Sequence, residues 1–267
     1  MTRSLLLGAT LAAWMSTTSV GAPSAPASDA PPIARDVEFE QRLGAQLPLE
    51  ARFVDSTGTP VRLGDLVGRR PVLLVPAYYE CPMLCGLVLN GVTRLVRALP
   101  LDVGDAFDVI VFSIDPDETP ALAAAKRTSL LDAYRRPGTE AGWHVLTGSQ
   151  ASITALTDAI GFRYARDPAT GQFAHASGFV VVTPDGRVAK YVFGVEYSPR
   201  DVRLAVVEAA EGRVGSVVDR LLLLCLQWDP TRGRYTTAVL VLLRAAGIVT
   251  LLGLAAFVWQ ARGGRAA

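Results

Sequence analysis

Between residues 51 and 212 the sequence alternates short apolar runs with longer segments of helical spacing, and this alternation restricts the possible folds. Residues 71–76 are almost entirely apolar and predict a buried strand. In residues 83–99, which follow, the apolar side chains recur at the spacing of an amphipathic helix. Such an alternation predicts an α/β domain with a mixed sheet flanked by helices.

The rest of this segment continues the pattern. Thr119 before Pro120, and Ser149 further on, are expected to cap the first turns of two helices. Pro184-Asp185-Gly186 predicts a hairpin turn, and residues 161–171 are expected to form a polar loop. The remaining expected elements are strands at 107–114, 143–146, 177–183 and 188–193 and helices from 119, at 149–160 and at 199–210.

The N-terminus has the features of an export signal. Arg3 precedes an apolar stretch from Leu5 to Met15, and Ala25-Pro26-Ala27 is a candidate cleavage site. Residues 1–27 are therefore expected to be a signal peptide, with an uncleaved anchor as the alternative. Residues 28–50 are expected to be a disordered lead-in, because their first part is rich in Pro, Ala and Ser.

The C-terminus contains a nearly unbroken apolar run at residues 238–259. As a helix it would be about 33 Å long, close to the hydrocarbon thickness of a bilayer. We expect a transmembrane helix at 238–260, preceded by a connector at 213–237 and followed by a cytoplasmic tail at 261–267; a buried core helix is the alternative. With the export signal, this predicts a single C-terminal span in the inner membrane of a bacterium and a soluble domain in the periplasm.

The overall charge and the cysteine count exclude two classes of protein. The net charge is +1 and no Lys/Arg-rich block is present, so no nucleic-acid partner is expected. Three cysteines and two histidines are too few for a disulfide framework, so each must be judged by its position.

Cys81 and Cys85 lie at the expected junction between a buried strand and a helix. Four residues apart on the first turns of a helix, both sulfurs can approach one ion or each other. A helix N-terminus also lowers the pKa of a nearby thiol, which favours metal binding or disulfide exchange. Two buried structural cysteines are the simpler alternative for such a pair.

His175 lies just before an expected strand. Alone it would be read as a surface-loop histidine. Two thiolates and an imidazole, however, form a soft ligand set suited to copper, and the same set could hold zinc with a water in the fourth position.

These residues resemble a known family. Cys81-Pro82-Met83-Leu84-Cys85 after an apolar strand is similar to the Cys-Pro-x-x-Cys motif of the Sco/SenC copper proteins, which help to assemble the copper site of cytochrome c oxidase. The stretches at 113–120 (SIDPDETP), 143–148 (WHVLTG) and 175–178 (HASG) resemble other motifs of that family in the same order.

The resemblance implies a thioredoxin-like fold and a copper ion bound by Cys81, Cys85 and His175. It also implies two protein partners, the copper-containing subunit of the oxidase and an upstream copper donor. The chain departs from the family in having Ala174 where an Asp usually precedes the metal-binding His, which would weaken the orientation of the imidazole. Family members are often anchored by an N-terminal helix, whereas the anchor expected here is C-terminal.

Three further residues have two interpretations each. Asp115, at the end of an expected strand, either approaches the cysteines and tunes their pKa values or stabilises a turn. His144 is expected to be structural, and Cys225, within an apolar run, is expected to be a buried and inert thiol rather than a further copper or redox group.

The function expected first is a copper metallochaperone, which is not an enzyme. A thiol–disulfide reductase, in which Cys81 attacks a target disulfide and Cys85 resolves it, is the alternative. His175 discriminates between them, because a dithiol exchange does not need it. A thiol peroxidase is a weaker third alternative, since no Thr or Arg is clearly placed to activate a cysteine.

Overall fold

A computed structural model of the chain describes residues 37–80, 84–168 and 170–215, and short pieces at 228–229, 234–235, 244 and 247–254. For Leu84 and Cys85 only the backbone is described. Nearly all of the expected α/β domain is therefore described, but Cys81 and Cys225 lie outside these residues, as do residues 1–36.

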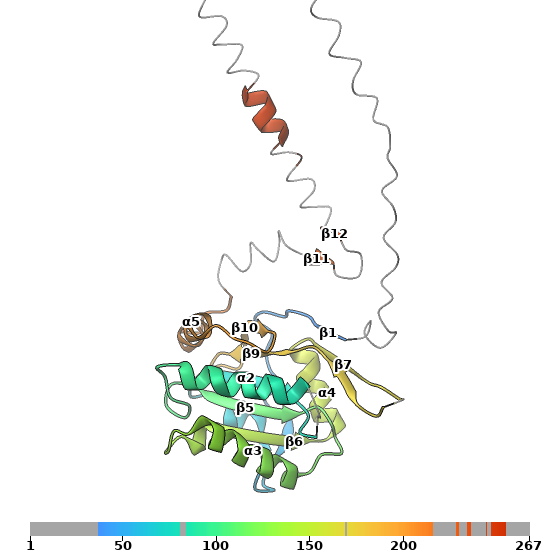
Figure 1. The fold of residues 1–267 in the computed structure, drawn as a ribbon, viewed down its shortest axis with the longest axis vertical. Coiled ribbons are helices and arrows are strands. Elements are labelled where there is room, and N and C mark those ends of the chain that lie inside the picture. Colours follow the sequence, from blue (N-terminus) through green and yellow to red (C-terminus); the bar gives the residue numbers. More distant parts are fainter. Residues whose placement is uncertain are drawn as a thin grey trace, which may run out of the picture. The chain divides into compact units, whose positions relative to one another are not determined.

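The described domain is built on a mixed sheet (Figure 1). Its strands are β2 (Arg52–Asp55), β3 (Pro60–Arg62), β4 (Val72–Ala77), β5 (Asp108–Ser113), β6 (Trp143–Gly148), β9 (Gly178–Val182) and β10 (Val188–Phe193). They are arranged in the order β10-β9-β4-β5-β6-β2-β3. The central strands β4, β5 and β6 are parallel, whereas β9 joins β4, and β2 joins β6, in antiparallel register.

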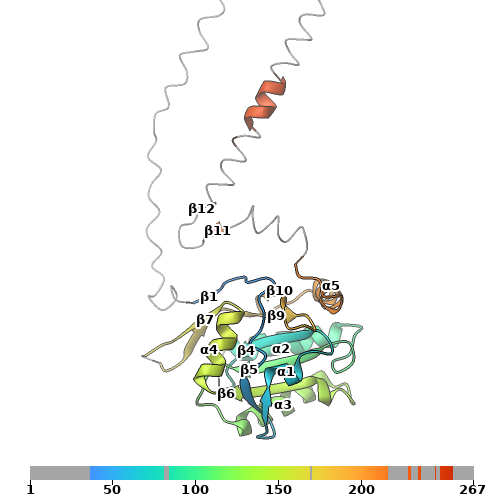
Figure 2. The same cartoon turned by 180° about the vertical axis from the view of Figure 1, so that it is seen from behind.

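The helices cover both faces of this sheet. They are α1 (Leu63–Leu66), α2 (Leu84–Ala98), α3 (Pro120–Tyr134), α4 (Gln150–Ala159) and α5 (Pro199–Ala210). Helices α2 and α3 pack on each other over one face with α5 beside α2, and α4 lies over the opposite face (Figures 1 and 2). The expected N-caps are confirmed: the Thr119 side chain accepts a hydrogen bond from the N–H of Leu122, and Ser149 accepts one from Ser152.

The centre of the core is formed by β4 and β5, whose residues are all buried. A strand with helices on both faces has no solvent side, so its sequence reads as a continuous apolar run. Residues 71–76 and 107–114 show this pattern, and the mixed sheet flanked by helices expected from it is confirmed.

A smaller sheet corrects the expectation for two segments. It has the order β1-β7-β8 and consists of β1 (Glu38–Phe39), β7 (Phe162–Arg166) and β8 (Phe173–His175). Residues 162–166 of the expected loop at 161–171 therefore form a strand, with Phe162 buried, and the described residues from 167 to 171 form a turn, as expected. Residues 37–50, expected to belong to a disordered lead-in, contain β1 and the buried side chains of Phe39 and Leu47. The ordered domain thus begins before residue 51.

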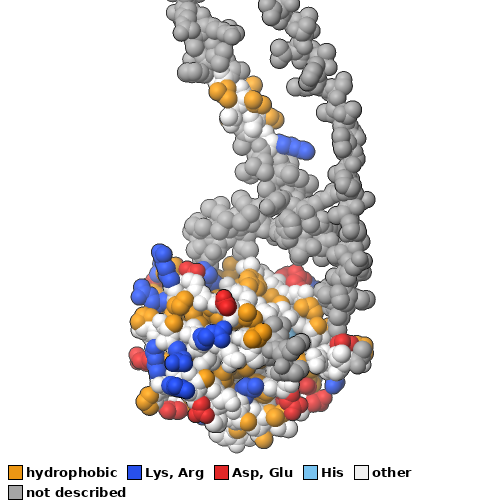
Figure 3. Space-filling view, viewed as in Figure 1, with side chains coloured by type: hydrophobic (Ala, Val, Ile, Leu, Met, Phe, Trp, Pro, Cys, Tyr) orange, Lys and Arg blue, Asp and Glu red, His pale blue; other side chains and the backbone are white. Residues whose placement is uncertain are grey.

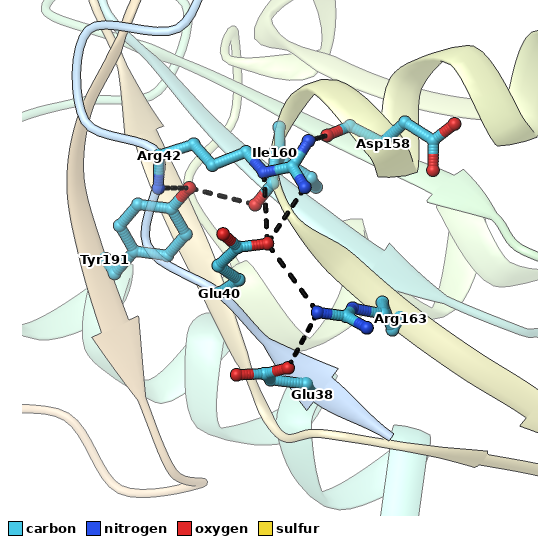
Figure 4. A network of polar contacts seen from close by, with 7 residues as sticks. All are labelled: Glu38, Glu40, Arg42, Asp158, Ile160, Arg163 and Tyr191. Atoms are coloured by element: carbon cyan, nitrogen blue, oxygen red, sulfur yellow. Dashed lines mark hydrogen bonds and ion pairs between the residues drawn. The ribbon is translucent and has the colours of Figure 1, made fainter. Parts of the chain in front are cut away.

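A polar network ties this N-terminal segment to the domain (Figure 4). The N–H of Arg42 donates to the Tyr191 hydroxyl at 2.8 Å, and that hydroxyl donates to the carbonyl of Ile160 at 2.9 Å. The Arg163 guanidinium reaches a carboxylate oxygen of Glu38 at 2.9 Å. Strands β1, β7 and β10 are thereby joined at one edge of the domain.

Basic side chains gather over the half of the domain that carries α5 and the end of α2 (Figure 3). Arg94 and Arg97 lie on the last turns of α2, and Arg200 and Arg203 lie exposed on α5. Cations near a helix C-terminus are stabilised by the helix dipole. The basic residues of α2 therefore lie at the end of the helix opposite to its cysteine.

Among the described residues, no helix is both long and apolar enough to cross a bilayer. Of the expected span at 238–260, only residue 244 and residues 247–254 are described, all in helical conformation. Two short strands before it, β11 (Trp228–Asp229) and β12 (Arg234–Tyr235), pair in antiparallel register.

Candidate metal centre

The Cys81–Cys85 segment follows directly on the central strand β4. That strand ends at Ala77, and α2 begins at Leu84, which places Cys85 in the first turn of the helix. The strand–helix junction expected for the two cysteines is therefore confirmed, although residues 81–83 themselves lie outside the described part of the chain.

His175, the last residue of β8, lies beside the residues that lead into this segment. Its ring centroid is 6.3 Å from that of Tyr78 and 5.9 Å from that of Phe162. The side chain is buried rather than placed on a surface loop. The structure thus brings the only histidine expected to bind metal next to a residue three positions before Cys81.

The His175 ring has a defined tautomer. Its Nδ1 lies 2.9 Å from the carbonyl oxygen of Ala176, which can only accept a hydrogen bond. Nδ1 therefore carries the proton, and Nε2 carries the lone pair that a metal ion requires. Burial lowers the pKa of His175, which favours the neutral form needed for metal binding. This backbone contact orients the ring where Ala174 offers no carboxylate.

The path of β9 explains why His175 lies at this end of β4. Strand β9 starts at Gly178 and pairs with β4 in antiparallel register, so its beginning lies towards the end of β4. A side chain at Gly178 would meet the carbonyl oxygen of Val192 at 2.5 Å, and its φ is +150°. Only glycine fits there, so this glycine allows the chain to turn from β8 into β9 directly beside the site.

Pro76 ends the pairing of β4 with β9. Ala77 accepts a hydrogen bond from Ile114 next to β5, so Pro76, one residue earlier, faces β9. Proline has no N–H to donate, and the last β4–β9 pair is Leu74 with Val180. Beyond that pair the ladder therefore lacks the hydrogen bond that an N–H at position 76 would donate, at the end of the sheet towards which His175 lies.

Glu118 contacts the two residues that precede Cys81, and its role was missed from the sequence. Its Oε1 accepts hydrogen bonds from the N–H groups of Tyr79 and Glu80, at 2.5 and 2.9 Å. Its Oε2 accepts one from the Ser113 hydroxyl at 2.6 Å. Burial raises the pKa of Glu118, and the hydrogen bonds from Ser113 and from the two N–H groups oppose this shift.

Asp115 has the role of a turn residue. Its Oδ1 accepts a hydrogen bond from the N–H of Asp117 at 2.9 Å, as in an Asx turn. The carboxylate that binds the residues directly before Cys81 is that of Glu118, three residues later. The sequence signal was available, since Glu118 lies in the same stretch, but spacing alone does not show which carboxylate points inward.

His144 lies away from the candidate site, in β6, at the level of Leu74 rather than at the end of β4. Burial and the nearby Arg127 and Arg70 lower its pKa.

No group of His, Cys, Asp or Glu that could hold a metal ion lies within the described residues. A set of Cys81, Cys85 and His175 includes residues outside them and stays a prediction.

The sequence profile of the SCO1/SenC family matches residues 41–211, which is most of the described domain. The chain belongs to the SCO1/SenC family. Its thioredoxin-like fold, expected from the resemblance of its motifs, is thereby confirmed.

Individual proteins show a likeness to this chain as well. A protein of Stutzerimonas stutzeri described as copper-binding is 26% identical over 149 residues, which is 54% of this chain and 67% of that protein. A crystal structure from Aquifex aeolicus, described as an electron transfer protein, is 28% identical with a TM-score of 0.56, covering 64% of this chain and 96% of the other. Arabidopsis thaliana ScoI, solved with copper bound, is 15% identical with a TM-score of 0.51. The match covers 64% of this chain and 99% of that structure, and it shows that the two share a fold.

Proposed function

We propose that this SCO1/SenC protein is a copper metallochaperone that holds one copper ion through Cys81, Cys85 and His175. The observation that carries the proposal is the buried imidazole of His175, with its Nδ1 proton directed to Ala176, beside the residues that precede Cys81. A dithiol reductase would have no use for an imidazole oriented in this way. The copper bound to Arabidopsis ScoI and the description of the Stutzerimonas relative support the choice of metal.

The ligand set suits a metal that must be released as well as held. Thiolates are soft ligands that favour Cu(I), and an imidazole binds either oxidation state. The position of Cys85 in the first turn of α2 favours its thiolate form. A site with three protein ligands can pass its ion to a partner by exchanging one ligand at a time. We propose the copper-containing subunit of cytochrome c oxidase as the recipient and an upstream copper donor as the source.

Titration of the purified, reduced chain with copper tests this assignment. One copper ion per chain is expected, with a sulfur-to-copper charge-transfer band in the Cu(II) form. Binding should weaken in Cys81→Ala, Cys85→Ala and His175→Ala, and the cysteine changes should weaken Cu(I) binding most. His144→Ala is the matched control and should bind copper as the wild type does. An unchanged affinity in the Cys81/Cys85 double variant would exclude this site.

The thiol–disulfide reductase remains the second candidate, because Cys81 and Cys85 at a strand–helix junction also suit disulfide exchange. His175→Ala separates the two functions, since it removes a metal ligand and leaves the dithiol in place. For a chaperone, oxidase assembly in cells that carry this variant should fail under copper limitation and recover partly with added copper. Normal assembly under copper limitation would instead support the reductase.

We also propose that the domain lies in the periplasm, anchored by residues 238–260 after removal of a signal peptide. Full-length protein should then stay with the membranes after a carbonate wash at high pH, and its mature N-terminus should lie between residues 22 and 30. A chain that ends before Thr236 should be released into the periplasm. Membrane retention of this shortened chain, or recovery of the full chain from the cytosol, would refute the anchor.

A further inference from the structure

Glu118 links three parts of the domain through one carboxylate. It lies in the turn between β5 and α3 and is 7% exposed. Oε2 is held by the hydroxyl of Ser113, the last residue of β5, and Oε1 accepts the N–H groups of Tyr79 and Glu80. The residue that follows these two N–H groups is Cys81.

The two N–H groups lie past the end of β4, beyond the residues that pair with β5 in the sheet. The last ladder contact of this strand with β5 is the hydrogen bond from Ile114 to the carbonyl of Ala77, at 2.8 Å. Burial of a carboxylate is costly unless its oxygens are hydrogen-bonded, and here three donors meet it. Glu118 therefore accepts the hydrogen bonds of Tyr79 and Glu80, which no longer pair with a neighbouring strand.

A second contact holds the same segment from the other side. The Tyr79 side chain is buried, and its hydroxyl donates to the carbonyl oxygen of Leu146 in β6 at 2.5 Å. The backbone of Tyr79 is thus bound to Glu118 and its side chain to β6. The backbone of Glu80, the next residue, is bound to Glu118 as well.

We propose that Glu118 is a positioning residue for Cys81, which fixes the backbone directly before this cysteine so that its thiol enters the copper site at a defined place. The copper part of this inference rests on the proposed function. The restraint on the backbone of Tyr79 and Glu80 does not, because it is present in the metal-free chain as well.

Two substitutions separate the loss of the hydrogen bonds from the loss of the charge. Glu118→Gln keeps an acceptor oxygen for Tyr79 and Glu80, and its amide can donate to Ser113, whose hydroxyl already lies 3.0 Å from the carbonyl of Asp115. Glu118→Ala removes every contact. Asp115→Asn is the matched control, because Asp115 is an acidic residue of the same turn whose carboxylate bonds to Asp117 instead.

The first measurement uses the reduced, metal-free, full-length chain. The rates at which iodoacetamide alkylates Cys81 and Cys85 are compared at pH 9.5, where thiols of ordinary pKa are mostly ionised and access decides the rate. Glu118→Ala should change the ratio of the two rates at least threefold. Glu118→Gln and Asp115→Asn should leave it within twofold of the wild type.

The second measurement titrates the same variants with copper chloride. Glu118→Ala should weaken Cu(II) binding at least tenfold and shift the charge-transfer band. Glu118→Gln should bind within threefold of the wild type with the band unchanged. A role in general stability alone would lower the unfolding midpoint without moving this band.

Several results would overturn the proposal. One is a folded Glu118→Ala variant with the alkylation ratio and the copper band of the wild type; another is a Glu118→Gln variant that behaves like Glu118→Ala. If Glu118→Ala does not fold, Ser113→Ala is measured instead, because it removes one hydrogen bond to the Glu118 carboxylate. The alkylation ratio and the copper band should then change in the same direction but by less. No change in either would refute the proposal. If the wild type binds no copper but the alkylation ratio changes as expected, the copper function is wrong and the positioning role stands.

Discussion

At the start of β5, the carboxylate of Asp108 is buried and paired through one oxygen, with Oδ2 at 3.2 Å from the Arg70 Nε. Its other oxygen, Oδ1, has no hydrogen-bond partner among the described residues. Burial raises the pKa of Asp108 to about 6, against the opposing effect of Arg70 and Arg69. An acid whose pKa is higher in the folded state binds its proton more tightly there, so its ionisation destabilises the fold.

Replacement of Asp108 by Asn should therefore stabilise the protein at neutral pH. As the pH rises from about 4 to about 6, the wild type should lose unfolding free energy relative to the variant, and the difference should reach about 3 kcal/mol and stay constant above that range. Urea denaturation at several pH values measures it. Asp102→Asn, which removes an exposed ion pair with Arg136, should show a much smaller difference. Parallel stability curves for Asp108→Asn and the wild type would contradict the prediction.

Single residues also show the limit of what the sequence predicts. The positions of Cys85 after a strand and of Ser149 at a helix start followed from local patterns and were correct. The sequence pointed to Asp115 rather than Glu118, and which of the two carboxylates turns inward is set by hydrogen bonds to Ser113 and to the distant residues Tyr79 and Glu80. Local spacing does not contain that information.

At the scale of elements, the long and uniformly buried strands β4 and β5 were predicted within a residue or two, because burial on both faces leaves a continuous apolar run. Strands β1, β7 and β8 were missed. They are short, and β7 mixes Arg with aromatic residues because one of its sides is exposed. The candidate metal ligand His175 lies on this missed sheet, so its burial could not be predicted.

The turn from β8 into β9 gives a prediction at this scale. Gly178→Ala should destabilise the domain by about 2–4 kcal/mol, because the new methyl group would collide with the carbonyl of Val192 at a positive φ. It should also weaken copper binding by displacing His175. Gly58→Ala is the control: its φ is +85° but nothing lies within 4 Å of the added carbon, so a loss of about 1 kcal/mol is expected. Equal losses in the two variants, measured by urea denaturation, would show that the Val192 contact is unimportant.

At the scale of the whole molecule, the ordered domain begins earlier than its composition indicates. Phe39 and Leu47 are buried, and Phe39 packs edge-on against Phe162 at 5.0 Å between ring centroids. A Pro/Ala/Ser-rich stretch upstream predicts disorder, but two apolar side chains and one polar network are enough to order the residues that follow it.

Removal of residues should reveal this boundary. A chain that comprises residues 37–215 should unfold cooperatively and keep its β7–β8 sheet. A chain that comprises residues 51–215 should lose about 4 kcal/mol, since burial of each of the two side chains contributes about 2 kcal/mol. Thermal unfolding of the two chains gives the comparison. Equal midpoints would mean that the N-terminal segment is not part of the folding unit.

Pro76 has a consequence for how this molecule moves. Beyond Leu74 and Val180 the strands β4 and β9 lack one hydrogen bond of a regular antiparallel ladder, because Pro76 has no N–H to donate. Fewer hydrogen bonds therefore resist separation of these two strands at this end of the sheet than in its middle. Amide deuterium exchange should therefore follow a gradient along β9, faster at Gly178 than from Val180 onward, and the end of the domain that holds His175 should open more often than its core.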